Sequence, residues 1–157
     1  DGSSGGPVVP GLGFVPSTRG AQSSTDPSVP AVLAPGKRPL SSMSPTIVLK
    51  DGKPILAVGA AGGPTIITQT LLAIIHTVDF GRPLKEALAQ PHFHHQWAPN
   101  QIRIERKVGE KVLTQLRKRG HSLKVYSQMG ATQATSLRNG KFDAAHDPRL
   151  KGKATAY

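Results

Sequence analysis

A glycine-rich junction at residues 59–66 constrains the fold of this chain more than any other feature. The residues Gly-Ala-Ala-Gly-Gly-Pro-Thr-Ile follow an apolar run typical of a strand and lead into an apolar stretch typical of a helix. The first backbone N–H groups of a helix have no intrahelical partner, and the helix dipole makes that end electropositive. Glycine lets an anion approach the main chain, and Pro64 suits the first helical position. The junction therefore predicts a strand-turn-helix unit that is either a tight turn or an anion site such as an oxyanion hole.

The segments around the junction predict an α+β fold with a mostly antiparallel sheet and packed helices. Apolar runs at 46–49 and 55–58 flank an Asp-Gly pair, which is typical of a β-hairpin. Residues 64–78 are apolar nearly all round, which indicates a helix buried against the sheet. Periodicity and stop signals predict the remaining elements: helices at 83–90 and 108–119, and strands at 101–105, 121–127, 131–137 and 141–145.

Composition divides the chain near residue 35. Residues 1–35 are rich in Gly, Pro and Ser and carry few charges, so they cannot bury enough apolar surface to offset their ordering entropy. We expect a flexible or extended arm there. Residues 36–157 hold nearly all the charge and the predicted elements, and the total of 157 residues suits one folded domain.

The chain is strongly basic, with a formal net charge of +11. Its Lys and Arg residues are scattered, and aromatic residues make up only 4% of the chain, so it lacks the stacking platform of a single-strand nucleic-acid binder. A solvated basic surface is expected, and a basic interaction module is kept as an alternative. The absence of cysteine excludes disulfides and thiolate metal sites, and no apolar run approaches the length of a membrane span.

Two adjacent serines, Ser41 and Ser42, follow the basic pair Lys37 and Arg38 and precede the first predicted strand. Hydroxyl groups next to backbone amides and a cation can hold a carboxylate. The same composition is also typical of a capped loop without a ligand.

Three histidines lie within four residues, at His92, His94 and His95. Strand-like alternation would put His92 and His94 on one face and His95 on the other, and the cluster offers no thiolate or carboxylate. We therefore expect a packed or hydrogen-bonding segment, with no metal and no cofactor.

Six motifs occur in the order seen in one known family. Together they resemble the small, C-terminal subunit of γ-glutamyltranspeptidases over residues 36–157. The motifs are residues 36–46 with the paired serines, Gly62-Gly63, Asp79-Phe80-Gly81, residues 91–97, residues 129–133 and Asp147-Pro148-Arg149.

The resemblance implies an N-terminal-nucleophile hydrolase, an αββα sandwich in which a threonine exposed by autocatalytic cleavage attacks a γ-glutamyl amide. By resemblance, Ser41 and Ser42 bind the α-carboxylate of the donor, and Gly62 and Gly63 form the oxyanion hole. The implied partners are glutathione or other γ-glutamyl compounds and the large subunit of the enzyme, without nucleic acid. The implied location is periplasmic or extracellular.

The chain also departs from the family pattern. The family's threonine-led segment is not recognisable in residues 1–35, and neither Thr18 nor Thr25 stands in the expected context. Ala60 and Ala61 replace a usual Ser-Pro, and His92 replaces a usual arginine. We expect an incomplete domain that carries half of an active site, has no nucleophile of its own and is inactive alone. The alternative is a non-catalytic carboxylate-binding or basic interaction module.

Overall fold

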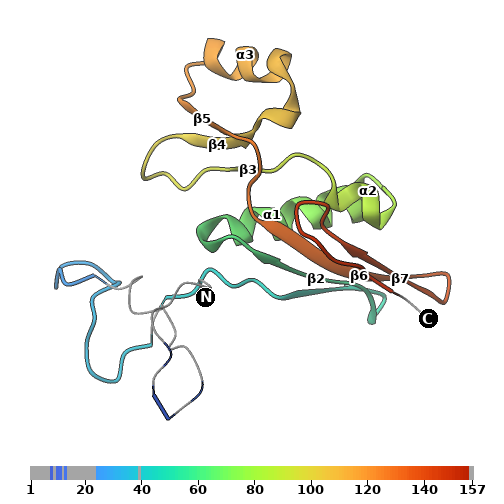
Figure 1. Cartoon of the computed structure of the whole chain (residues 1–157), viewed down its shortest axis with the longest axis horizontal. Helices are drawn as coiled ribbons and strands as arrows, with labels where there is room; N and C mark the ends of the chain where they lie inside the picture. The colour runs from blue at the N-terminus through green and yellow to red at the C-terminus, as the bar shows by residue number, and fades with distance from the viewer. Residues whose placement is uncertain (1–7, 9, 12, 14–23, 39, 156–157) are drawn as a thin grey trace. The chain divides into compact units, whose positions relative to one another are not determined.

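The computed structural model of the chain describes residues 8, 10, 11, 13, 24–38 and 40–155 (Figure 1). Its contacts divide the chain into two units, Asp1–Ser42 and Met43–Tyr157. In the first unit, Ser24 forms a parallel bridge with Val32, and the Asp26 carboxylate accepts hydrogen bonds from the backbone N–H and hydroxyl of Ser28. Much of the predicted arm at 1–35 lies outside the described residues, so its flexibility stays a prediction.

The second unit is built around a four-stranded antiparallel sheet of order β1-β2-β6-β7. The two hairpins predicted from sequence are both present. Their turns place Asp51 and Gly52 at φ 51° and 74°, and Asn139 and Gly140 at φ 51° and 74°. Positive φ at both central positions is the hairpin geometry that Asp-Gly and Asn-Gly pairs favour. The strands are β1 (Thr46–Lys50), β2 (Lys53–Ala61), β6 (Ala131–Arg138) and β7 (Lys141–His146).

A second sheet has three strands, β3 (Phe93–His94), β4 (Ile102–Glu105) and β5 (Leu123–Tyr126). Strand β4 pairs antiparallel with β3 and parallel with β5, and helix α3 (Glu110–Lys118) forms the crossover between the parallel strands. Strand β3 is not among the predicted strands, although the histidine stretch was expected to alternate like one, because a two-residue strand gives no signal for its bounds. The predicted α+β class with mostly antiparallel strands is confirmed, but the strands belong to two sheets.

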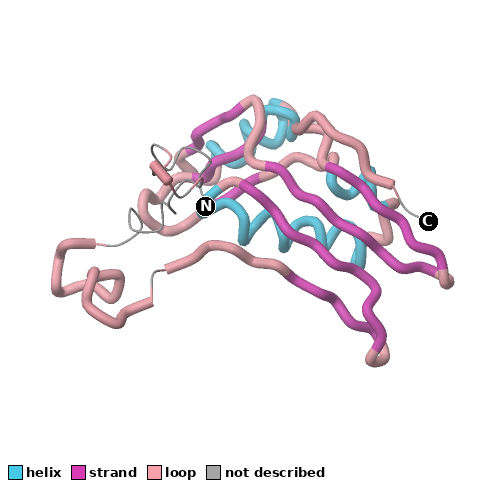
Figure 2. Tube along the Cα trace, turned by 60° about the horizontal axis from the view of Figure 1, so that its bottom comes forward, coloured by secondary structure: helices cyan, strands magenta, loops and turns pink. Residues whose placement is uncertain are grey.

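The glycine junction leads into one continuous helical segment, as expected. A 3-10 turn at Gly63–Thr65 opens it, α1 (Ile66–Ile74) continues it, and a π-helical turn at Ile75–Asp79 ends it. Together with α2 (Leu84–Leu88), this segment lies across one face of the four-stranded sheet (Figure 2). The core between helices and sheet consists of Leu56, Val58, Ala73, Leu84, Leu88, Ala134 and Ala145.

Two apolar surfaces remain exposed in the second unit. The helix packs against the sheet as expected, but on the outer side of the helical segment Ile67 and Leu71 are 54% and 52% exposed, so the helix is also a surface helix on that side. On the uncovered face of the sheet, Ile47 and Phe142 are 66% and 64% exposed. Among the described residues, no helix is long and apolar enough to cross a membrane.

Candidate active site

The turn between β2 and α1 lies at the surface of the second unit. Gly62 and Gly63 are exposed and adopt φ of 148° and 61°, which an L side chain rarely tolerates. Pro64 lies in the first turn of the helical segment, and no hydrogen bond joins the Gly63 N–H to any described residue. An outward N–H at a helix start can donate to an anion or to the oxygen of a tetrahedral intermediate.

The paired serines belong to a different unit. Ser41 is exposed and Ser42 is partly buried, and both lie at the end of the first unit, whereas Gly62 and Gly63 belong to the second. That the serines and the glycine turn face one ligand therefore stays a prediction.

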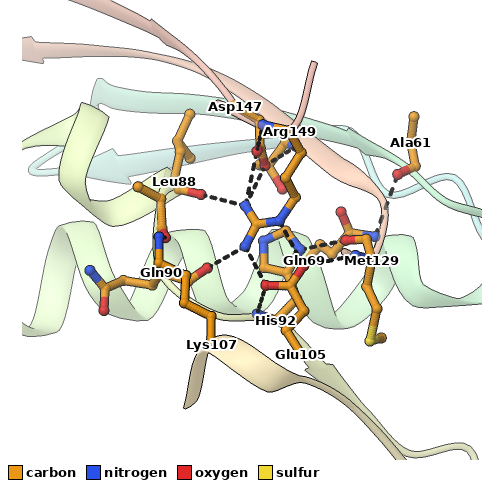
Figure 3. Close-up of polar contacts among 12 residues, drawn as sticks. Ala61, Gln69, Leu88, Gln90, His92, Glu105, Lys107, Met129, Asp147 and Arg149 are labelled. Carbon is orange, nitrogen blue, oxygen red and sulfur yellow. Dashed lines mark hydrogen bonds and ion pairs between the residues drawn. The ribbon is translucent and has the colours of Figure 1, made fainter. Parts of the chain in front are cut away.

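A buried ion cluster lies in the second unit (Figure 3). The Arg149 guanidinium binds Glu105 through Nε and Nη2 at 2.7 and 2.6 Å, and Asp147 through Nη1 at 2.9 and 3.1 Å. It also donates to the carbonyls of Leu88 and Gln90 at 3.0 and 2.7 Å. The guanidinium thus satisfies two buried carboxylates and two main-chain acceptors, which is the planar, two-sided geometry that lysine cannot provide.

This cluster could not be recognised in the sequence, although Asp147-Pro148-Arg149 is one of the six motifs of the family resemblance. Burial acts to raise the pKa of Glu105, but Arg149 and the N–H groups of His92 and Met129 outweigh it and hold that pKa below its ordinary value. Burial likewise acts to lower the pKa of Arg149, and its two carboxylate partners raise it instead. Both shifts favour the ionised forms of Glu105 and Arg149 at neutral pH.

The cluster fixes the loop next to the glycine turn. Glu105 accepts the Met129 N–H at 2.7 Å, and the Met129 carbonyl hydrogen-bonds His92 Nδ1 at 2.7 Å. The following residue, Gly130, packs so closely that an added Cβ would lie 2.5 Å from the Ala61 carbonyl oxygen. The end of β2 therefore packs against the loop at Met129 and Gly130, and the buried ion cluster fixes the position of that loop.

The three neighbouring histidines have separate partners. His92 is buried and bonds Met129, His94 is buried and lies 3.0 Å from Thr68 Oγ1, and exposed His95 lies 3.0 Å from Asn100 Oδ1. The sequence predicted that His92 and His94 lie on one face and His95 on the other, and the burial of the first two and the exposure of the third agree with it. Within the described ranges, no three His, Asp or Glu side chains converge as a metal site.

Stability is expected to fall as the pH drops below neutrality, because His92 must remain neutral. Burial lowers the pKa of His92 from 6.5, and Arg149 lowers it further against the opposing hydrogen bond to Met129. The unfolded chain then binds more protons than the folded chain, so the stabilisation present above pH 6.5 is lost as the pH falls. The slope contributed by one such group is at most about 1.4 kcal/mol per pH unit.

Urea denaturation between pH 8 and 5 measures this slope. His92→Gln should flatten it, whereas His95→Gln, at the exposed neighbour, should leave it unchanged. Some slope should persist in His92→Gln, since burial also lowers the pKa of His76. An identical slope in wild type and His92→Gln would contradict the assignment.

Comparison with solved structures defines the class of this fold. The chain is similar to a point mutant of Helicobacter pylori γ-glutamyltranspeptidase, with a TM-score of 0.85 and 34% identity, covering 95% of this chain and 87% of that one. Pseudomonas nitroreducens γ-glutamyltranspeptidase, solved in complex with L-DON, gives a TM-score of 0.87 and 32% identity over 96% and 85% of the chains. The chain therefore has the N-terminal-nucleophile hydrolase fold that the resemblance implied.

Sequence comparison identifies the family. The γ-glutamyltranspeptidase family model matches residues 4–157, so the similarity extends beyond the predicted range of 36–157 towards the start of the chain. The chain is 42% identical to the glutathione hydrolase proenzyme of Escherichia coli K12 over 125 residues, which are 79% of this chain and 22% of that protein. This chain belongs to the γ-glutamyltranspeptidase family. It spans about a fifth of the length of that curated relative.

Proposed function

We propose that this chain supplies the oxyanion hole and the donor-carboxylate site of a γ-glutamyl transfer enzyme. The observation that carries the proposal is the exposed Gly62–Gly63 turn at the start of the helical segment. A nucleophile attacking a γ-glutamyl amide creates a tetrahedral oxyanion, and the N–H groups of Gly62 and Gly63 would donate to it. The hydroxyls of Ser41 and Ser42 would donate to the α-carboxylate of the donor.

The nucleophile in this proposal is a threonine from another segment of the protein. Its hydroxyl would form an acyl-enzyme that passes the γ-glutamyl group to water or to an amine. Because related proteins are named glutathione hydrolase proenzymes, glutathione is the first donor to test. A periplasmic or extracellular location belongs to the same proposal.

The uncovered sheet face supports a role for this chain as one part of a larger assembly. Besides Ile47 and Phe142, that face holds a hollow of about 560 Å³ lined by small and apolar strand residues, among them Ala57, Gly59 and Ala144. Exposed apolar patches of this kind mark surfaces that another protein surface covers. We propose that the remainder of the enzyme, the large subunit in the family, packs there.

Binding of L-glutamate tests the carboxylate site. Saturating L-glutamate should raise the melting temperature of the chain, since a ligand at about 100 times its Kd adds about 2.7 kcal/mol. Replacing both Ser41 and Ser42 by alanine should weaken the affinity at least about tenfold, because hydrogen bonds to charged groups contribute about 1.5–3 kcal/mol. Ser44→Ala, in the same segment, is the matched control and should bind like wild type.

Activity assays test the rest of the proposal. The purified chain should not hydrolyse glutathione by itself, and hydrolysis should depend on addition of a threonine-led family segment. Hydrolysis by the chain alone would contradict this division of labour. If L-glutamate does not change the melting temperature, the proposed donor site is contradicted. DNA binding with a steep salt dependence would then favour the alternative, a basic interaction module.

A further inference from the structure

Two buried polar side chains lie beneath the glycine turn. Gln69 and Thr65 are 1% and 7% exposed. Gln69 Nε2 donates to Thr65 Oγ1 at 2.7 Å and to the Ala61 carbonyl at 3.5 Å, a contact visible in Figure 3. Thr65 Oγ1 in turn donates to the Gly62 carbonyl at 2.9 Å. A continuous hydrogen-bond chain therefore runs from the helix interior to the turn.

The donor and acceptor roles along this hydrogen-bond chain follow from the groups that form it. The Ala61 carbonyl can only accept, so the side-chain NH₂ of Gln69, and not its oxygen, faces that end of β2. An NH₂ group only donates, so the Thr65 oxygen accepts from it. The single hydroxyl proton of Thr65 is then left for the Gly62 carbonyl.

The Gln69 amide has room beneath the turn only because Gly62 and Gly130 lack a Cβ. A Cβ at Gly62 would lie 2.7 Å from Gln69 Nε2, and a Cβ at Gly130 would lie 2.2 Å from it. Gln69 Oε1 is buried and has no hydrogen-bond partner in the described part of the chain, which is a cost in stability. An apolar residue at 69 would avoid that cost, so the side chain is better explained by what its NH₂ group orients.

We infer that Thr65 and Gln69 are positioning residues that aim the Gly63 N–H outward as an anion donor. The Gly62 carbonyl and the Gly63 N–H belong to one planar trans peptide and point in opposite directions. Holding the carbonyl inward on Thr65 therefore turns the N–H away from the helix. That the anion is the oxyanion of acyl transfer rests on the proposed function.

Nuclear magnetic resonance of the ¹⁵N-labelled chain tests the inference, with sodium acetate as the anion probe. Acetate should shift the Gly63 amide resonance of the wild-type chain in a saturable way. Thr65→Val, which removes the hydroxyl at constant shape, and Gln69→Leu should each weaken this response about tenfold. Thr65→Ser keeps the hydroxyl and should restore it, which a purely structural role of the side chain would not require.

Thr70→Val is the matched control. Thr70 is buried on the same helix, and its hydroxyl has no hydrogen-bond partner among the described residues, so its loss should leave the acetate response of Gly63 intact. A wild-type response in Thr65→Val and Gln69→Leu, or no response of Gly63 in the wild type, would overturn the inference. The variants could weaken the acetate response as expected while the chain fails to bind γ-glutamyl compounds. That outcome would support the positioning role and contradict only the proposed function.

Discussion

Replacement of Arg149 by leucine is expected to lower the free energy of unfolding by about 3–5 kcal/mol. The substitution would leave the carboxylates of Glu105 and Asp147, whose side chains are 2% and 0% exposed, buried without their cation. It would also remove the donors to the carbonyls of Leu88 and Gln90. Urea denaturation at pH 7 measures the loss.

Arg106→Leu is the matched control for Arg149→Leu. Arg106 pairs with Glu110 at 3.4 Å, but both side chains are exposed, at 71% and 67%. Solvent screens such a pair, and its loss is expected to cost no more than about 0.5 kcal/mol. If the two leucine variants had similar stability, the buried cluster would not have the role assigned to it.

Gly130→Ala is expected to destabilise the chain by about 3 kcal/mol, combining the strain of a left-handed backbone with overpacking. Gly130 has φ 55°, and its new methyl group would lie 2.5 Å from the Ala61 carbonyl oxygen. The main chain at the end of β2 cannot yield as a flexible side chain would. The same denaturation assay measures the effect, and the Gly63 amide resonance should move as well, because the glycine turn rests on this loop.

Gly120→Ala separates the two sources of strain. Gly120 has φ 86°, but an added Cβ would meet no atom within 4 Å. This variant should lose only the backbone component, about 1 kcal/mol. Equal losses at Gly120 and Gly130 would show that the close approach to β2 contributes nothing.

Much of the fold could be predicted because its signals are local. The Asp-Gly and Asn-Gly pairs specify both hairpins, and the charges and the glycine that end α3 lie within one turn of it. The separation into two sheets could not be predicted, since β2 pairs with β6, which follows three intervening strands in the sequence, and local signals do not show such a pairing. The exposure of the outer side of α1 could not be predicted for a different reason. Apolar residues indicate that a helix face can be buried, but they do not show whether this chain supplies the surface that covers it.

The residues of the candidate site also differ in whether the sequence alone could predict them. Gly62 and Gly63 could be predicted as a candidate anion site because paired glycines before a proline expose main-chain N–H groups at a helix start, and that role stays a prediction. Thr65 and Gln69 were missed, since two polar residues one turn apart carry no signal until their hydrogen bonds are seen. Glu105 was read only as a strand residue, because its partner Arg149 lies 44 residues away.

The buried ion cluster also has a consequence for folding. Its members come from the end of β4, from the loop before β6, from the segment after β7, and from the end of α2 and the residues that follow it. The bonds that Glu105 makes to Arg149 and to the Met129 N–H join the second sheet to segments next to β6 and β7, and without them the buried carboxylate would lack its partners. Intermediates with a single sheet assembled should therefore be disfavoured, and we expect the two sheets to form and melt together as one cooperative unit.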